Sequence, residues 1–283
     1  MLYIKPFTLI NNRYSIRYLE ESGGQGSVRL AMDTQLETWV AVKISPVDSG
    51  ASQEGDVYAK LGPQPGFLAV LWSGTQDGVH LLVMDRLLCT LHKFLDFALL
   101  KRIRLPAEDI MAAIAFTLSP LRILHEHGFV HCDITPFNIG YKNARPHHPL
   151  CLFDLASAVP YVDSDGCHVE WQEVDGRTLY LSSEFSSVNI QLGQTPSRRN
   201  DLESLAYTAA YALRYPKPLP WSHLCNLFGA DRKIARMKKE CSNSELFGAF
   251  SCFALLLDYA RGLGFTEEPD YDYLIGAFQS ALR

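Results

Sequence analysis

The clearest apolar pattern lies in the middle of the chain. Apolar residues recur there every three or four positions, which places them on one face of a helix spanning residues 107–127: Ile110, Ile114, Leu118, Leu121 and Leu124. Glu108 and Asp109 would lie in its first turn, where the helix dipole favours acidic side chains. We interpret the apolar stripe as core, not as a binding surface.

The N-terminal part of the chain has the patterns of β-strands. Tyr14–Leu30 is typical of strand, turn and strand, and Thr38–Ile44 is a β-branched strand that carries one lysine. Val79–Met84 is a further apolar strand, and Ser49–Leu61 favours a short helix. A second long helix is predicted from Asp201 onwards. The order predicts an α+β fold, with a β-rich N-terminal part and a mostly α-helical C-terminal part.

Composition narrows the class of protein. The length of 283 residues, with 47% hydrophobic and 20% charged residues, suits one large domain or two small lobes. The net charge of −5 does not favour a nucleic-acid surface, and no polybasic run favours a membrane. The oligomeric state stays open.

The cysteines and the apolar runs bear on the compartment. The seven cysteines are scattered and form no Cys-x-x-Cys pair, so they indicate neither a zinc site nor a disulfide framework. The first ten residues do not have the pattern of a secretory signal, and no apolar run approaches the ~20 residues that span a bilayer. We therefore expect an intracellular protein, in the cytoplasm or the nucleus.

Oxygen-bearing side chains follow two apolar runs. Asp133 and Asn138 stand five positions apart after Phe129-Val130, and Asp154 follows the apolar run 150–153. An Asp and an Asn suit a hard divalent cation, and a second Asp can accept a proton from a hydroxyl. An Asx-rich turn is the alternative for this spacing alone.

A glycine-rich turn precedes the lysine strand. Three glycines fall within the turn Gly23-Gly24-Gln25-Gly26, where backbone N–H groups can approach a phosphate. Lys43 follows in Val-Ala-Val-Lys, and Glu54 in the next predicted helix can pair with it. The alternatives are a flexible hairpin tip, a surface lysine and a solvated helix face.

These motifs together resemble those of eukaryotic-type protein kinases. The stretch His131-Cys-Asp-Ile-Thr-Pro-Phe-Asn138 resembles the catalytic loop, and Asp154-Leu-Ala resembles the metal-binding Asp-Phe-Gly triplet. The glycine-rich turn followed by Val-Ala-Val-Lys43 resembles the loop and the lysine that contact the phosphates. Residues 176–184 resemble the end of an activation segment, and Asp201 matches the buried Asp that braces the catalytic loop.

Three further stretches resemble the casein kinase one and vaccinia-related kinase branch. They are Ser197–Trp221, Phe265–Leu274 and Glu54–Tyr58. The sequence Asp133-Ile-Thr-Pro-Phe-Asn138 is also similar to that of herpesvirus protein kinases, which points to a viral source. The resemblance covers the chain from about Tyr14 to its end.

The resemblance implies a bilobal protein kinase-like fold, with an N-lobe over residues 1–86 and a C-lobe over residues 87–283. It implies ATP and Mg²⁺, with Asp133, Lys43 and Asn138 as catalytic residues and with Asn138 and Asp154 holding the metal. Asp133 would orient a substrate hydroxyl and accept its proton. The residues that would surround ATP are Glu21, Ser22, Gly23, Gly24, Gln25, Gly26, Ser27, Val28, Ala41, Lys43, Glu54, Met84, Asp85 and Leu87.

Four positions depart from the kinase pattern. Glu21 replaces the first loop glycine, Cys132 replaces the Arg of His-Arg-Asp, Thr135 replaces a Lys, and Leu155-Ala156 replaces Phe-Gly. The first hypothesis is a Ser/Thr protein kinase that transfers the ATP γ-phosphate to protein substrates. The second is a pseudokinase that binds partners. Phosphate transfer to a small molecule is the third, and residues 176–184 and 197–201 disfavour it.

Overall fold

The computed structural model describes residues 4–23, 26–47, 51–142, 150–173 and 184–283. The chain divides into two compact units. The first, here the N-terminal unit, comprises Met1–Cys89 and Tyr141–Ala156; the second, the C-terminal unit, comprises Thr90–Gly140 and Ser157–Arg283. The N-terminal unit is rich in strands and the C-terminal unit in helices, as the sequence pattern predicts for an α+β fold.

The division differs from the sequence-based one at two places. The first unit runs to Cys89 instead of residue 86, and it includes a second stretch, Tyr141–Ala156. Local pairing explains the second stretch, because Leu152 N donates to Gly66 O at 2.8 Å and strand β10 (Leu150–Leu152) bridges to Phe67. Such long-range pairing has no local sequence signal.

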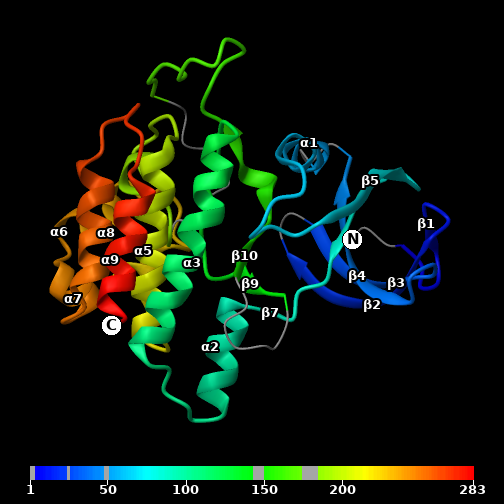
Figure 1. Cartoon of the computed structure of the whole chain (residues 1–283), viewed down its shortest axis with the longest axis horizontal. Coiled ribbons are helices and arrows are strands. Elements are labelled where there is room, and N and C mark those ends of the chain that lie inside the picture. The colour runs from blue at the N-terminus through cyan, green and yellow to red at the C-terminus, as the bar shows by residue number, and fades with distance from the viewer. Residues whose placement is uncertain (1–3, 24–25, 48–50, 143–149, 174–183) are drawn as a thin grey trace. The chain divides into compact units, whose positions relative to one another are not determined.

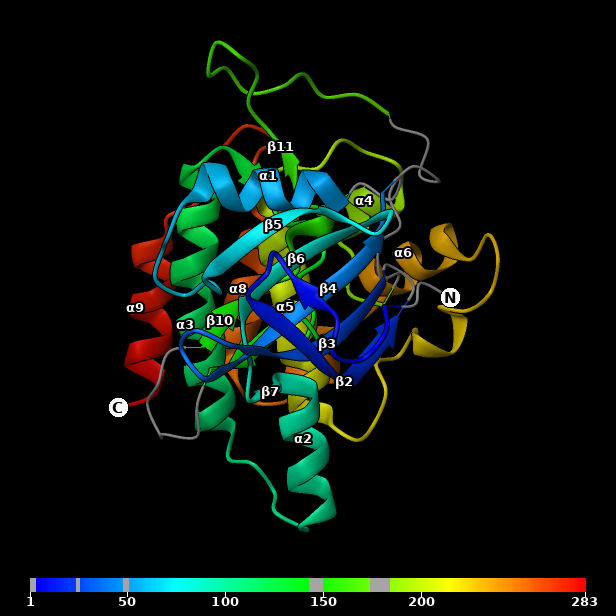
Figure 2. The ribbon, with the colours of Figure 1, turned by 90° about the vertical axis from the view of Figure 1, so that its right-hand side faces the viewer.

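The N-terminal unit is built on an antiparallel sheet, which in the described residues has the strand order β1-β2-β3-β4-β6-β5. Its strands are β1 (Leu9–Ile10), β2 (Tyr14–Gly23), β3 (Gly26–Asp33), β4 (Thr38–Pro46), β5 (Val70–Gln76) and β6 (Val79–Asp85). Helix α1 (Ala51–Leu61) contacts β5 and β6 (Figures 1 and 2). Gly55 permits this approach, since a Cβ there would lie 2.7 Å from Ser73 Oγ.

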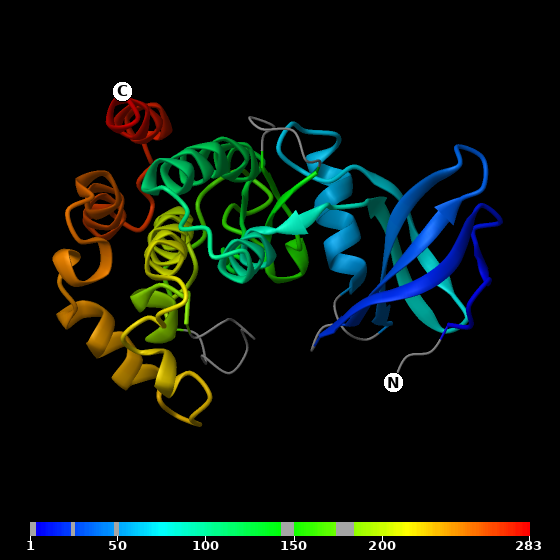
Figure 3. The ribbon, with the colours of Figure 1, turned by 90° about the horizontal axis from the view of Figure 1, so that it is seen from below.

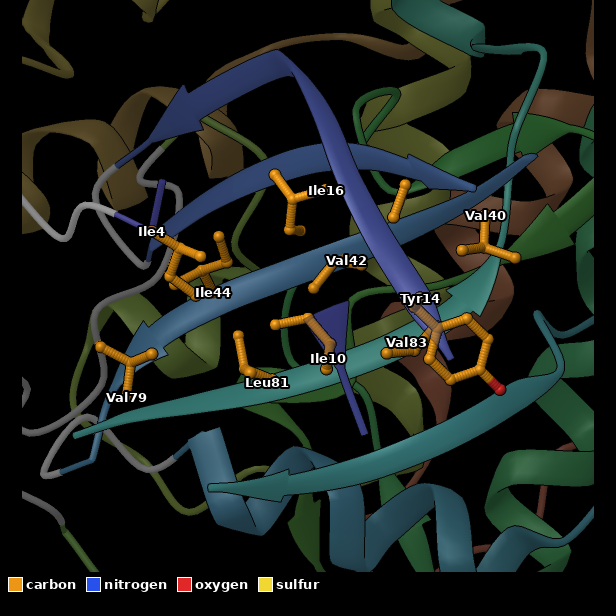
Figure 4. Close-up of a cluster of buried hydrophobic side chains, with 11 residues drawn as sticks. Ile4, Ile10, Tyr14, Ile16, Val40, Val42, Ile44, Val79, Leu81 and Val83 are labelled. Carbon is orange, nitrogen blue, oxygen red and sulfur yellow. The ribbon is translucent and has the colours of Figure 1, made fainter. Parts of the chain in front are cut away.

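Strand alternation separates the core of this unit from its polar face. Val40, Val42 and Ile44 of β4 are buried in one apolar cluster, which Figure 4 shows together with residues from β1, β2 and β6. Since successive strand residues face opposite sides of a sheet, Ala41 and Lys43 lie on the other face. The same alternation that builds the core therefore sets the face on which Lys43 stands.

The C-terminal unit is a helical assembly in which helix α5 is largely buried. Helices α3, α4, α7 and α8 all contact α5, and α3 and α8 also contact α9 (Figures 1 and 3). The helices are α2 (Leu91–Leu100), α3 (Ala107–Glu126), α4 (Val188–Gln191), α5 (Arg198–Arg214), α6 (Asp231–Glu240), α7 (Asn243–Phe247), α8 (Ser251–Gly262) and α9 (Tyr271–Ala281).

Short strands and two single turns of 3-10 helix complete the described elements. The strands are β7 (Cys89–Thr90), β8 (Phe129–Val130), β9 (Ile139–Tyr141) and β11 (Val159–Pro160), and the 3-10 turns are η1 (Leu155–Ser157) and η2 (Ser222–Leu224). No helix within the described ranges is both long and apolar enough to cross a membrane.

Helix α5 begins earlier than the sequence predicts. Its first residue is Arg198, because Ser197 and Asn200 form a capping box. In this box each side chain accepts a hydrogen bond from the backbone N–H of the other residue. Asp201 is therefore inside the helix and is not its N-cap. Its carboxylate instead accepts hydrogen bonds from the backbone of His131 and Cys132.

Gly128 links α3 to the loop that follows strand β8. Its φ of +82° lies in the left-handed region, and a Cβ there would lie 2.6 Å from Val162 Cγ2. Strand β8 then pairs antiparallel with β11. The chain thus leaves the buried stripe of α3 by a tight turn and enters residues 131–138 from a strand.

Lys238 of α6 is a buried cation in the C-terminal unit. Its ammonium donates to Ser186 O at 2.6 Å and lies 4.8 Å from the ring of Tyr207 and 5.2 Å from that of Trp221. Burial lowers the pKa of this amine from 10.5 to about 7. The unfolded chain therefore binds a proton that the folded chain releases at mildly alkaline pH.

This difference predicts how stability depends on pH. Between about pH 7 and its ordinary pKa, Lys238 holds more protons in the unfolded chain, so the free energy of unfolding rises with pH by up to about 1.4 kcal/mol per unit. Lys238→Met should remove this contribution, whereas Lys239→Met, at an exposed neighbour, should keep it. Urea unfolding of the three proteins at several pH values measures it, and equal slopes in all three would contradict the assignment.

Candidate active site

Lys43 stands between two carboxylates in the N-terminal unit. Its ammonium lies 2.7 Å from Glu54 Oε2 and 2.7 Å from Asp154 Oδ1. The other Glu54 oxygen accepts a hydrogen bond from Leu155 N at 3.2 Å. The structure thus places the predicted lysine and its predicted glutamate together. Strand β4, helix α1 and the segment after β10 each supply one charged group to this cluster.

Burial sets the electrostatics of the cluster. Burial lowers the pKa of Lys43, but the charges of Glu54 and Asp154 outweigh it and the net shift is upwards. Burial raises the pKa of Glu54, Lys43 lowers it and Asp154 raises it, and the net shift is upwards. Lys43 is therefore a permanent cation, and it is the group that allows a carboxylate to be buried at Glu54.

Asp154 has an unusual backbone and an accessible carboxylate. Its φ of +61° is in the left-handed region, which non-glycine residues rarely adopt outside sites that constrain them. Its side chain is about 30% exposed, and the described contacts with Lys43 and with Ala156 N both use Oδ1. Oδ2 is therefore the oxygen that can take a cation from solvent.

The hairpin of β2 and β3 ends at the predicted phosphate-binding residues. Its register pairs Glu21 with Val28, Ser22 with Ser27, and Gly23 with Gly26. The turn residues Gly24 and Gln25 lie outside the described part of the chain. The next register pairs Val28 of β3 directly with Lys43 of β4.

Ser27 carries an orphaned polar atom in that hairpin. Its Oγ is buried and has no hydrogen-bond partner among the described residues. A buried hydroxyl without a partner is uncommon in proteins, and a bound group that accepts a hydrogen bond would satisfy it. A phosphate oxygen has that chemistry, so this residue fits the proposed nucleotide.

Two further residues predicted to surround ATP occupy neighbouring strands. Ala41 and Met84 are register partners on β4 and β6, and both are buried. Asp85 ends β6, and its carboxylate accepts from Ala69 N at 3.2 Å and from Lys142 at 3.1 Å. Leu87 is half-buried in the segment that follows.

Asp133 and Asn138 meet in the C-terminal unit. Asn138 Nδ2 donates to Asp133 O at 2.9 Å and to Asp133 Oδ2 at 2.8 Å. Both bonds use the amide nitrogen, so the carbonyl oxygen of Asn138 points away from Asp133 and can serve as a metal ligand. Thr135 is buried and shapes the turn, since its hydroxyl accepts from Phe137 N at 3.2 Å.

Asp201 braces the backbone of this loop. Its buried carboxylate accepts from His131 N at 2.7 Å and from Cys132 N at 2.9 Å, which is the role that the sequence comparison predicts. Cys132 has a φ of +65°, a strained conformation for a residue with a side chain. The two charge-assisted hydrogen bonds hold that strained backbone next to Asp133.

Two residues that sequence reasoning missed complete the brace. His125 Nε2 lies 2.9 Å from Asp201 Oδ2, and His125 Nδ1 hydrogen-bonds the hydroxyl of Tyr271. Burial lowers the pKa of His125, which favours the neutral ring. A neutral ring with its proton on Nε2 satisfies both bonds, donating to Asp201 and accepting from Tyr271. The signal was available, because His125 falls four residues after Leu121 on the buried stripe of α3.

Cys132 supplies no charge at the position where the protein kinases that this chain resembles carry an Arg. Burial raises the pKa of its thiol well above the ordinary value, so it is neutral. The side chain packs in an apolar cluster with Val130 and Tyr161. Asp201 holds the backbone of the loop, and the side chain at position 132 supplies no cation.

The sequence from Glu184 onwards is anchored to the C-terminal unit. Trp221 Nε1 donates to Glu184 O at 2.8 Å, and the Ser222 hydroxyl bonds the Glu184 carboxylate. The preceding residues 174–183, which hold most of the predicted activation-segment motif, lie outside the described residues.

The oxygen donors expected for Mg²⁺ belong to different compact units, Asn138 to the C-terminal unit and Asp154 to the N-terminal unit. The described residues contain no group of three or more His, Cys, Asp or Glu that could hold a metal ion. A carbonyl oxygen, one carboxylate oxygen and water are nevertheless a donor set that suits Mg²⁺, which commonly uses few protein ligands. No protein-family model matches the chain.

Removing the brace should destabilise the protein. Asp201→Ala leaves two buried backbone N–H groups without their acceptor, so we expect a loss of roughly 3–5 kcal/mol in the free energy of unfolding. Asp231→Ala, an exposed aspartate in α6, is the matched control and should cost under about 0.5 kcal/mol. Urea unfolding measures both. A loss of under about 1 kcal/mol for Asp201→Ala would show that the bonds do not hold the loop.

Proposed function

We propose that this chain is a Ser/Thr protein kinase with a bilobal kinase-like fold, which transfers the γ-phosphate of ATP to protein hydroxyl groups with Mg²⁺. The observation that carries the proposal is Lys43, held at 2.7 Å by both Glu54 and Asp154. A buried ammonium positioned by a helix glutamate is the group that protein kinases use to pair phosphates.

The loop of the C-terminal unit supports the same function. Asp133 is oriented by Asn138 and by the brace from Asp201, so its carboxylate has a fixed direction. In the proposed reaction Asp133 accepts the proton of the attacking Ser or Thr hydroxyl. The carbonyl oxygen of Asn138 and the carboxylate of Asp154 would hold Mg²⁺, which when bound would neutralise charge on the transferred phosphate. Lys43 orients the α- and β-phosphates.

Nucleotide binding is assigned to the residues around Lys43. Ala41 and Met84 form a paired apolar surface for the adenine ring, and the segment from Asp85 to Leu87 offers backbone groups to its edge. Ser27 offers its orphaned hydroxyl to a phosphate oxygen. Glu21, at the position of the first loop glycine, is the acidic exception and should weaken ATP binding by repulsion.

We place the activity in the cytoplasm or the nucleus, the reducing compartments that the scattered cysteines of the sequence favour. The anchoring of Glu184 by Trp221 and Ser222 favours a protein substrate, because protein kinases position protein substrates with this part of the chain.

A partner-binding pseudokinase is the second candidate, and the neutral Cys132 and the buried Thr135 favour it. Position 135 loses a cation that would neutralise the transferred phosphate, and position 132 loses one that would pair with a phosphorylated activation loop. The two candidates make different predictions about Asp133. In a kinase, loss of the Asp133 carboxylate lowers the rate of phosphate transfer. A pseudokinase has no such transfer to lose.

Asp133→Asn should therefore lower the rate of phosphate transfer by about 10²–10⁴-fold, the usual contribution of a positioned acid–base group. The variant keeps the side-chain shape, so ATP affinity and melting temperature should stay close to those of the parent. Transfer of labelled phosphate from ATP to casein measures the rate, with Asp165→Asn, at an exposed aspartate, as the control. Equal rates for the parent and Asp133→Asn would reject the kinase hypothesis, as would the absence of transfer despite ATP binding.

Asp154→Ala should remove the Mg²⁺-dependent part of ATP binding. A ligand at a hundredfold excess over its dissociation constant stabilises the folded protein by ~2.7 kcal/mol, so ATP with Mg²⁺ should raise the melting temperature of the parent. The rise should shrink in Asp154→Ala and persist in Asp56→Ala, at an exposed aspartate of α1. An unchanged rise in Asp154→Ala would show that this residue does not hold the metal.

A further inference from the structure

A cavity lies within the C-terminal unit and uses none of the residues assigned above. We call it the α2–α3 pocket: it has a volume of about 880 Å³ and lies between the end of α2, the connection to α3 and the end of α5. Figure 1 shows α2 and α3 joined at this end of the unit. A cavity of this size is in the range that binds ligands or partner side chains.

The floor and rim of the pocket are apolar. Leu95, Ala98 and Ile110 line it from buried positions on α2 and α3. Leu99 and Ile103 line it from exposed positions, with 46% and 55% of their surface accessible. Phe250 is a further exposed apolar residue in the lining. Contiguous exposed apolar surface on a folded protein commonly marks a contact site.

The charges at the pocket are strongly unbalanced. Four cations line it, Arg102, Arg104, Arg214 and Lys217, against the single carboxylate of Glu108. In the part of the chain that the structure describes, no ion pair is formed by Arg102, Arg104 or Lys217. The chain as a whole carries a net charge of −5, so this cationic rim is a local feature. Such a rim attracts and orients acidic partners.

We infer that the α2–α3 pocket is a docking site for a segment of a partner protein in which acidic side chains flank apolar ones. The apolar side chains would enter the cavity between Leu95 and Ile110, and the carboxylates would face Arg102 and Arg104. A small amphiphile such as a fatty acid would fill the cavity alone. The rim carries more cations than the single carboxylate of a fatty acid can pair, which favours a longer occupant with several acidic side chains.

The inference does not depend on the proposed phosphate transfer. All of the lining residues belong to the C-terminal unit, and none is Lys43, Asp133 or Asp154. Loss of docking should therefore leave ATP-dependent stabilisation unchanged, and loss of activity in Asp133→Asn should leave docking unchanged. Docking and phosphate transfer are therefore tested by separate measurements, and either one can fail while the other holds.

The test uses the full chain and a short fluorescent peptide in which leucines are flanked by glutamates. Two control peptides replace every glutamate by lysine or every leucine by serine. Fluorescence anisotropy should show binding of the leucine–glutamate peptide, with both controls weaker by about tenfold or more. Raising the salt concentration from about 0.05 to about 0.5 M should weaken binding of the acidic peptide, since exposed charges are screened.

The charge-reversed variant Arg102→Glu/Arg104→Glu should bind the acidic peptide about tenfold more weakly, because it loses two ion pairs and gains two repulsions. It should bind the lysine peptide more tightly than the parent does. Arg232→Glu/Lys233→Glu, on exposed residues of α6 outside the pocket, changes the net charge equally and should leave both affinities unchanged. Thermal unfolding confirms that each variant is folded.

Four results would overturn the inference. They are the absence of peptide binding to the parent, equal effects of the two charge-reversed variants, and preferential binding of a fatty acid such as laurate that excludes the peptide. The fourth is loss of self-association in Arg102→Glu/Arg104→Glu by sedimentation, which would identify a second copy of the chain as the occupant.

Discussion

The burial of Lys43 beside two carboxylates is the constraint on which the N-terminal unit depends. Taking an ammonium and a carboxylate out of water is costly unless each finds a partner at hydrogen-bond distance. Glu54 and Asp154 meet that condition, both at 2.7 Å from the Lys43 ammonium. Because the three residues come from a strand, a helix and a segment more than a hundred residues away, the charges fix the packing of all three.

A second constraint organises the C-terminal unit, and it too is electrostatic. Asp201 is buried in the first half of α5, where its carboxylate meets two backbone amides and a neutral His125. The bonds stabilise the positive φ of Cys132, which the chain would otherwise not adopt. Asp133 then follows directly in a loop whose backbone is held from a helix. The direction of one carboxylate is thus determined by the position of another.

The departures from the kinase pattern acquire a physical meaning from these contacts. Cys132 is a buried neutral thiol in an apolar cluster, and Thr135 uses its hydroxyl to shape the loop. Leu155 is fully buried and donates its N–H to Glu54. Cys132 and Thr135 thus form part of the loop around Asp133 without adding positive charge to it, and Leu155 links the backbone beside Asp154 to Glu54. An enzyme of this kind would carry fewer of the cations that assist phosphate transfer and that receive regulatory phosphates.

Local patterns were enough to predict much of the fold. Alternation in β4 and the stripe of α3 follow from neighbouring residues, and strands β2, β3 and β6 were predicted with small differences at their ends. The predicted start of α5, at Asp201, is too late, because a capping box formed by Ser197 and Asn200 begins the helix at Arg198. The assignment of Tyr141–Ala156 to the N-terminal unit depends on pairing between β10 and Phe67, which no local pattern encodes.

The candidate site was predictable to a similar degree. Lys43, Glu54, Asp133, Asn138 and Asp154 come from motifs that are recognisable one at a time. The contact between His125 and Tyr271 was not, because it joins residues 146 positions apart in the sequence. The α2–α3 pocket was also missed, since its cations come from two separate connections.

The proposed kinase activity requires Asn138 and Asp154 to hold one metal ion beside the phosphates of ATP. A crystal structure with Mn²⁺ in place of Mg²⁺ and a non-hydrolysable ATP analogue tests it most directly, because Mn²⁺ gives an anomalous signal that locates the ion. We expect one anomalous Mn²⁺ peak, bound by Asn138 Oδ1 and a carboxylate oxygen of Asp154. Lys43 should contact the α- and β-phosphates. A peak bound by neither residue, or a nucleotide bound elsewhere, would contradict it.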